Sequence, residues 1–122
     1  SLHMPLLDST RHFVNAETIA KMKDGVTIIN CARGDLIVEA DLIRALEEGK
    51  IYGAALDVFE QEPIPAGDPA WTAKNLLITP HISGQMSLGY TRDRNVQLFC
   101  EDLERYGRGE KPLRLVDRRI GY

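Results

Sequence analysis

The sequence predicts an α/β fold, in which a parallel sheet with covering helices forms half of a doubly wound domain, followed by a long helix and an extended tail. Short, apolar, β-branched runs alternate along the chain with stretches of helical period. The runs are apolar throughout, which is typical of strands covered on both faces of a parallel sheet. Ligands of such folds bind beyond the carboxyl ends of the strands.

Local signals place the elements in order along the chain. Strands are expected at 1–4, 26–31, 51–58 and 75–79, and helices at 16–23, 38–48 and 86–107. Asn15 is a favourable N-cap for the first helix, while Gly25 and Gly49 follow the first two helices as C-terminal glycines do. The proline-rich segment 62–69 interrupts any regular element, so we expect a loop there. The last helix should place four residues on one apolar face: Val96, Phe99, Cys100 and Leu103.

The bulk composition excludes several classes of function. The chain has 122 residues, the length of one ordinary domain, and a formal net charge of −3, which gives no basic field for nucleic acid. It contains no apolar run long enough for a membrane span and no signal peptide, so the expected location is the cytoplasm. Cys31 and Cys100 match no metal or redox spacing and are expected to be reduced, and the three histidines share no ligand spacing, so no metal site is expected.

Distinctive polar residues fall where the predicted strands end. Arg33 follows one strand and is followed by glycine, and its planar guanidinium suits bidentate binding of a carboxylate. His81 follows another strand and could exchange a proton with an alcohol or a carbonyl oxygen. Each residue alone is more often structural: a surface arginine in a turn, or a histidine that only donates hydrogen bonds.

The acidic loop before the prolines offers a partner for the imidazole. A carboxylate held against a histidine fixes its tautomer and favours its protonated form. Glu60 and Glu62 are both candidates, and composition does not choose between them. No GxGxxG and no GxxxxGK[ST] motif occurs in the chain, so no phosphate-binding glycine loop is expected within it.

Five segments together resemble the D-isomer-specific 2-hydroxyacid dehydrogenase family. They occur in the family's order over about residues 1–85: His3-Met4-Pro5-Leu6, Asn15-Ala16-Glu17, Ile29-Asn30-Cys31-Ala32-Arg33-Gly34, the stretch from Gly53 to Pro63 (GAALDVFEQEP), and Thr79-Pro80-His81-Ile82-Ser83-Gly84. The resemblance implies a Rossmann-like domain that binds NAD or NADP. It implies that 1–85 is the carboxyl-terminal half of that domain, 86–107 a helix leading back toward a substrate domain, and 108–122 an extended tail.

The resemblance also implies roles for particular residues. Arg33, Glu62 and His81 match the family's catalytic arginine, glutamate and histidine, and Glu62 is chosen over Glu60 because it directly precedes the proline. Hydride transfer between the nicotinamide and a small 2-oxo or 2-hydroxy acid is the implied reaction. The implied cofactor contacts are Pro5 and Leu6 on the adenine side, and Cys31, Ala32, Arg33, Asp57, His81, Ser83 and Gly84 around the nicotinamide.

Two departures from the family pattern qualify these expectations. Cys31 stands where the family often has Thr or Ser. The family's glycine-rich loop would have to precede residue 1, so the chain is expected to be a truncated part of the enzyme. The expected assembly is a homodimer. An NAD(H)-responsive corepressor-like module of the same fold is the alternative function. A phosphopeptide- or nucleotide-binding α/β domain of another family is a third possibility, which would make Arg33 and His81 coincidental.

Overall fold

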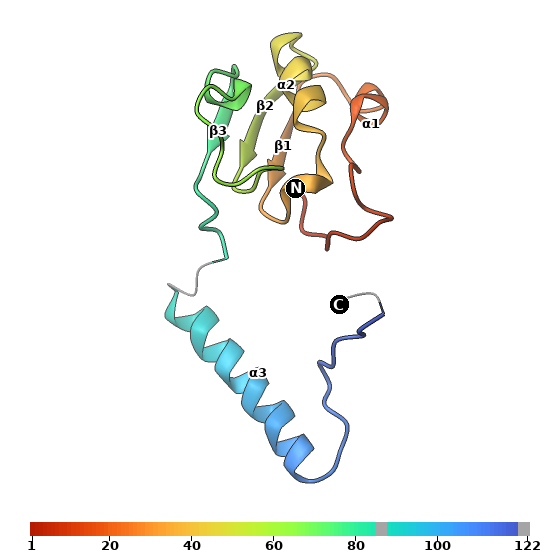
Figure 1. The fold of residues 1–122 in the computed structure, drawn as a ribbon, viewed down its shortest axis with the longest axis vertical. Coiled ribbons are helices and arrows are strands. Elements are labelled where there is room, and N and C mark those ends of the chain that lie inside the picture. The colour runs from red at the N-terminus through yellow and green to blue at the C-terminus, as the bar shows by residue number, and fades with distance from the viewer. Residues whose placement is uncertain (85–87, 120–122) are drawn as a thin grey trace. The chain divides into compact units, whose positions relative to one another are not determined.

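The computed structural model describes residues 1–84 and 88–119, which divide into two units, Ser1–Ser83 and Gly84–Tyr122. The first unit contains a three-stranded parallel sheet of order β1-β2-β3, made of β1 (Val26–Asn30), β2 (Ile51–Leu56) and β3 (Leu76–Ile78) (Figure 1). Leu2 extends the sheet by a single parallel bridge to Asn30, so the strand end expected at 1–4 is present as that bridge. The α/β prediction is therefore confirmed.

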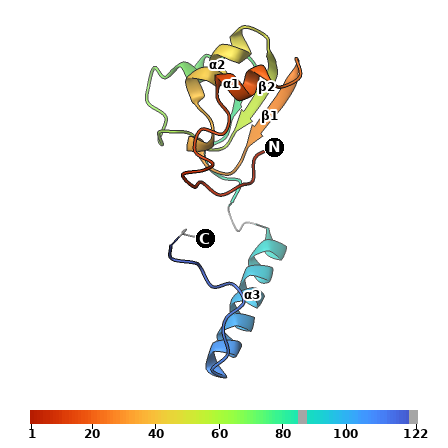
Figure 2. The ribbon, with the colours of Figure 1, turned by 90° about the vertical axis from the view of Figure 1, so that its right-hand side faces the viewer.

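Two α-helices cover one face of this sheet, α1 (Ala16–Ala20) and α2 (Glu39–Glu47) (Figure 2). The side chain of Asn15 caps α1 by accepting a hydrogen bond from Thr18 N, and the Thr18 hydroxyl accepts one from Asn15 N in return. The first helix is shorter than the expected 16–23, since Lys21 already caps it. After α2, Gly49 adopts a positive φ of 75°, which a residue with a Cβ rarely adopts, so the helix ends there.

The core lies between the sheet and these helices. Its fully buried side chains include Leu36, Ile37, Leu42, Leu46 and Ile51. The other face of the sheet is open in the described part of the chain, where Ile29 is 40% and Leu77 is 63% exposed. The expectation of strands covered on both faces is thus wrong for this structure, because α1 and α2 pack on the same side and no described element of unit 1–83 packs on the other.

The second unit consists of α3 (Gly89–Gly107) and the segment that follows it. The predicted start of this helix at Met86 lies outside the described residues, and none of the helix's residues is buried. The tail contains no helix or strand through residue 119, as expected, and folds back along α3. Arg114 donates to Glu101 at 2.8 Å and to Asp102 at 3.1 Å, so ion pairs hold it there. No described helix meets the length and hydropathy that crossing a membrane requires.

Candidate active site

The carboxyl ends of β1, β2 and β3 meet at one edge of the sheet because the strands are parallel. Arg33 follows β1, Asp57 directly follows β2, and His81 follows β3. Each of these residues therefore reaches the same edge from a different connection. The strands end there because a polar or turn-forming residue follows each apolar run.

Asn30 shapes the turn that carries Arg33. Its side chain is completely buried, and its amide donates to Arg33 O at 2.8 Å while its oxygen accepts from Ala32 N at 3.0 Å. Both ends of the amide are thus used to fix the turn backbone. The Arg33 side chain itself is exposed, and its guanidinium donates to Ala32 O at 2.7 Å. No hydrogen bond or ion pair joins the guanidinium to Glu62 or His81 among the described residues.

Gly34 brings the Arg33 turn against the loop that follows β2. A Cβ at this position would lie 1.9 Å from Phe59 O and 2.6 Å from Glu60 N, far inside van der Waals contact. Only a glycine allows the two backbones to approach this closely. The segment carrying Arg33 and the loop carrying Glu62 therefore pack directly on each other.

The imidazole of His81 and the carboxylate of Glu62 form a pair. His81 Nδ1 lies 2.6 Å from Glu62 Oε2, and the other Glu62 oxygen accepts a hydrogen bond from Phe59 N at 2.9 Å. Burial raises the pKa of Glu62, but the hydrogen bonds from His81 and Phe59 and the charge of His81 outweigh it, so the pKa is lowered. A carboxylate at Nδ1 leaves Nε2 as the imidazole nitrogen that can meet a substrate.

Glu60, the competing acidic residue, points elsewhere. Its carboxylate accepts a hydrogen bond from Glu39 N, the first residue of α2, at 2.9 Å. The structure thus brings Glu62 to His81, as the resemblance implied, and gives Glu60 a different contact. Composition could not make this choice, because it depends on which side chain the loop turns toward β3.

Asp57 holds the segment on both sides of His81. The carboxylate is only 3% exposed and accepts hydrogen bonds from the Thr79 hydroxyl, from Ile82 N at 2.9 Å and from Ser83 N at 2.8 Å. Burial raises the pKa of Asp57, but hydrogen bonds from the Ser83 and Thr79 side chains and from the backbone outweigh it and lower the pKa far below its usual value. His81, between these anchors, has a positive φ of 53°. Asp57 therefore orders the histidine loop.

A hollow of about 460 Å³ adjoins this pair. Four polar residues line it, Asp57, Glu62, Thr79 and His81, and the rest of its lining is largely apolar: Phe59, Pro63, Ile64, Trp71, Ile78 and Pro80. The indole of Trp71 donates to Pro65 O at 2.9 Å, which ties the proline-rich loop to the wall. An apolar hollow with a few convergent polar groups is the usual form of a small-molecule site.

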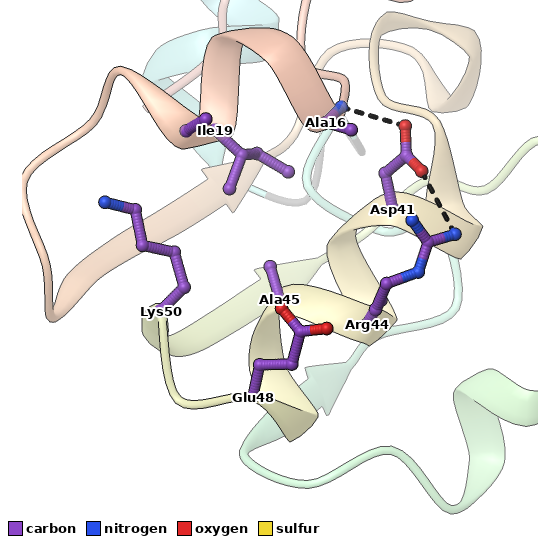
Figure 3. A pocket seen from close by; sticks show the side chains of 8 residues that line it. Ala16, Ile19, Asp41, Arg44, Ala45, Glu48 and Lys50 are labelled. Atoms are coloured by element: carbon purple, nitrogen blue, oxygen red, sulfur yellow. Dashed lines mark hydrogen bonds and ion pairs between the residues drawn. The ribbon is translucent and has the colours of Figure 1, made fainter.

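A second hollow, of about 370 Å³, lies between α1 and α2. Figure 3 shows Ile19 and Ala45 in its middle, with Lys50 on one side and Asp41 and Arg44 on the other. Asp41 accepts a hydrogen bond from Ala16 N at 2.8 Å and lies 3.5 Å from Arg44. This hollow contains none of the residues expected to act in catalysis.

The remaining expected site residues are spread over three places. Cys31 and Ala32 lie in the Arg33 turn, and Ser83 and Gly84 lie in the histidine loop, all but Ala32 exposed. Pro5 and Leu6 lie in the first connection, where Pro5 O accepts a hydrogen bond from the Thr10 hydroxyl at 2.7 Å. Both cysteines are free and exposed, and no cluster of potential metal ligands occurs among the described residues.

Sequence reasoning missed three residues that shape this edge: Asn30, Thr79 and Glu39. Asn30 could have been noticed, because a polar residue that closes an apolar, β-branched run is unusual and buried amides are normally satisfied. Glu39 and Thr79 give no such signal, since both look like ordinary residues near the end of an element.

Comparisons with known proteins agree on one family. Residues 1–83 match the sequence profile of the D-isomer specific 2-hydroxyacid dehydrogenase NAD binding domain. A hydroxypyruvate reductase of Blautia hydrogenotrophica is 46% identical over 97% of this chain and 36% of its own length. A glyoxylate reductase of Korarchaeum cryptofilum is 39% identical over 98% of this chain and 36% of its own length. The chain therefore spans about a third of the length of these curated relatives.

The solved structures point the same way. The crystal structure of a D-isomer specific 2-hydroxyacid dehydrogenase from Xanthobacter autotrophicus, in complex with NADPH and MES, superposes with a TM-score of 0.83 and 42% identity. The match covers 98% of this chain and 48% of that one.

Proposed function

The chain belongs to the D-isomer specific 2-hydroxyacid dehydrogenase family, and we propose that it carries the catalytic residues of an NAD- or NADP-dependent enzyme that reduces a small 2-oxo acid to the D-2-hydroxy acid. The observation that carries the proposal is the Glu62–His81 pair, 2.6 Å apart, at the sheet edge where Arg33 also lies, in the turn after β1. The hydroxypyruvate and glyoxylate reductases among the relatives support the choice of substrate class.

Arg33 would bind the substrate. Its guanidinium is exposed and, among residues 1–84 and 88–119, makes one hydrogen bond, to a neighbouring carbonyl oxygen, which leaves other donors for a carboxylate. Two parallel hydrogen bonds from a guanidinium fix a carboxylate in both position and orientation. In this role Arg33 anchors the acid group and polarises the adjacent carbonyl.

His81 would move the proton. With Nδ1 held by Glu62, Nε2 donates a proton to the carbonyl oxygen during reduction and accepts it from the hydroxyl during oxidation. Glu62 is ionised at neutral pH, since its pKa is lowered, and its negative charge favours the protonated imidazole. Asp57 would contribute indirectly by holding the loop that presents His81.

A nicotinamide cofactor would supply the hydride when bound. The edge fits its nicotinamide end, because Cys31 and Ser83 are exposed there and a Cβ at Gly84 would meet no atom within 4 Å. We assign this end to Cys31, Ala32, Arg33, Asp57, His81, Ser83 and Gly84. Pro5 and Leu6, in the first connection, are assigned to the adenine side.

The arrangement of the whole protein is part of the proposal. Residues 1–85 would form part of the nucleotide-binding domain, 86–107 would lead toward the substrate domain, and 108–122 would form a tail. A homodimer is the proposed assembly, because Val96, Phe99 and Leu103 of α3 are all more than half exposed and apolar surface of this kind favours association.

The test is an assay of the complete gene product that contains residues 1–122. We expect it to oxidise NADH or NADPH in the presence of glyoxylate or hydroxypyruvate, and His81→Asn to abolish turnover while cofactor binding is retained. A protein that binds NADH but reduces none of a panel of 2-oxo acids would instead favour the corepressor-like alternative. A protein that neither binds nor reduces would exclude both.

A further inference from the structure

Two segments far apart in sequence are joined beside the candidate site by a pair of glutamates. We propose that Glu39 and Glu60 are positioning residues, which clamp the loop carrying Glu62 onto the segment carrying Arg33 and so set the catalytic pair relative to the substrate anchor. This inference rests on the proposed function. Within the described residues, neither glutamate forms a hydrogen bond with His81 or Arg33.

The contact between the two glutamates is reciprocal. Glu39 N donates to Glu60 Oε1 at 2.9 Å, and Glu60 N donates to Glu39 Oε1 in a short hydrogen bond. Each residue is therefore held twice, once through its backbone and once through its side chain. Such a pair fixes the distance and the relative rotation of two backbones that are 21 residues apart.

The clamp lies on a continuous route of contacts to the catalytic pair. At one end, Gly34 lets the Arg33 turn pack on the backbone of Phe59 and Glu60. Phe59 N then donates to Glu62 at 2.9 Å, and Glu62 holds His81 at 2.6 Å. A displacement of Glu60 would therefore move Phe59, and with it the carboxylate that holds the imidazole.

Stability alone is a poor explanation for two carboxylates in this place. Burial raises the pKa of Glu39, and the hydrogen bond from the Glu60 backbone lowers it. The negative charges nearby, of which Glu60 has the largest effect, raise it further, so the pKa of Glu39 lies above its usual value. The ionised pair is thus electrostatically unfavourable, although each carboxylate gains a charge-assisted hydrogen bond from a backbone amide. What the pair provides is a defined geometry between two loops.

The experiment uses the complete gene product and its 2-oxo acid reductase activity. Glu60→Ala should lower kcat about tenfold, since a misplaced general acid loses much of its effect, while the Kd for NADH changes less than twofold. Glu60→Gln should lose no more than about twofold, because its amide oxygen still accepts the Glu39 amide. Glu48→Ala, an exposed glutamate just after α2, is the matched control and should leave activity unchanged.

A double-mutant cycle separates positioning from general stability. In a Glu62→Gln background, Glu60→Ala should cause less than a twofold further loss, because the group it positions has already been changed. A tenfold loss in both backgrounds would overturn the proposal, as would a Glu60→Gln variant as impaired as Glu60→Ala. Should Glu60→Ala fold poorly, Glu39→Ala gives the same comparison from the other side of the clamp.

The outcome also separates this inference from the proposed function. If the wild-type protein reduces 2-oxo acids and the Glu60→Ala and Glu39→Ala variants are as active as the wild type, the clamp is overturned and the proposed function stands. If the wild-type protein reduces no 2-oxo acid, both are overturned.

Discussion

Two hollows within residues 1–83, one beside the Glu62–His81 pair and one between α1 and α2, use their charged groups in different ways. Between α1 and α2, Asp41 bonds the first amide of α1, and Lys50 donates to Met22 O at 2.7 Å, so these charges connect elements of the fold. At the carboxyl ends of the strands, Glu62 and His81 bond each other at the surface, with the histidine side chain 51% exposed. A hollow of similar size thus serves packing in one place and presents a titratable pair in the other.

The difference follows from topology. Parallel strands bring connections that are distant in sequence to one edge, where their ends leave backbone turns and exposed side chains. The space between α1 and α2 is bordered by helix sides and short turns, whose polar groups are used locally.

The largest expected difference in activity is between variants of Arg33, at the strand ends, and of Arg44, in the hollow between α1 and α2. In the complete gene product, Arg33→Ala should reduce kcat/KM for a 2-oxo acid by about three powers of ten or more, because it removes a charge-assisted bidentate contact at the reacting centre. Arg33→Lys should recover only part of this loss, since an ammonium lacks the planar fork. Steady-state kinetics would measure this loss, and near-normal activity of Arg33→Ala would show that Arg33 does not bind the substrate carboxylate.

The next largest effect on activity is expected at Glu62. Glu62→Gln should lower kcat/KM by about two powers of ten, because removal of the negative charge disfavours the protonated imidazole that acts as general acid. Steady-state kinetics at a fixed pH measures this effect, and near-normal kcat/KM of Glu62→Gln would argue against the role of Glu62.

A stability difference of about 2 kcal/mol is expected at Asp57. Asp57→Asn leaves one acceptor oxygen for three donors, so at least one partly buried donor loses its partner. The folded pKa of Asp57 is lowered, so its contribution to stability is complete above the unfolded value of 3.8 and is lost as pH falls through the lower folded value. Denaturant melts of the wild type should therefore weaken more steeply below about pH 4 than those of the variant.

The smallest effect is expected between the helices. Arg44→Ala removes an exposed guanidinium that lies 3.5 Å from Asp41, a surface ion pair that contributes about 0–1 kcal/mol. Activity should stay within about twofold of the wild type, and the free energy of unfolding should change by less than about 1 kcal/mol. A large loss of activity would show that the second hollow takes part in the reaction, and the contrast between the hollows would no longer hold.

The order and type of the elements follow from local sequence signals, and the family motifs indicate the residues of the candidate site. Helix and strand ends are marked by local groups, such as the Asn15 cap and the glycine after α2, so 38–48 was predicted within one residue of Glu39–Glu47. The proline that directly follows Glu62 in the family motif also selected Glu62 instead of Glu60.

How these residues are held depends on contacts between distant segments of the fold. The anchoring of the His81 loop by Asp57, and the pairing of Glu39 with Glu60, join residues more than 20 positions apart. No local propensity encodes such contacts, because they exist only once the strands have set the distance between two loops. The open second face of the sheet was decided in the same way: apolar residues at Ile29 and Leu77 favour burial, but burial also requires an element that packs against them.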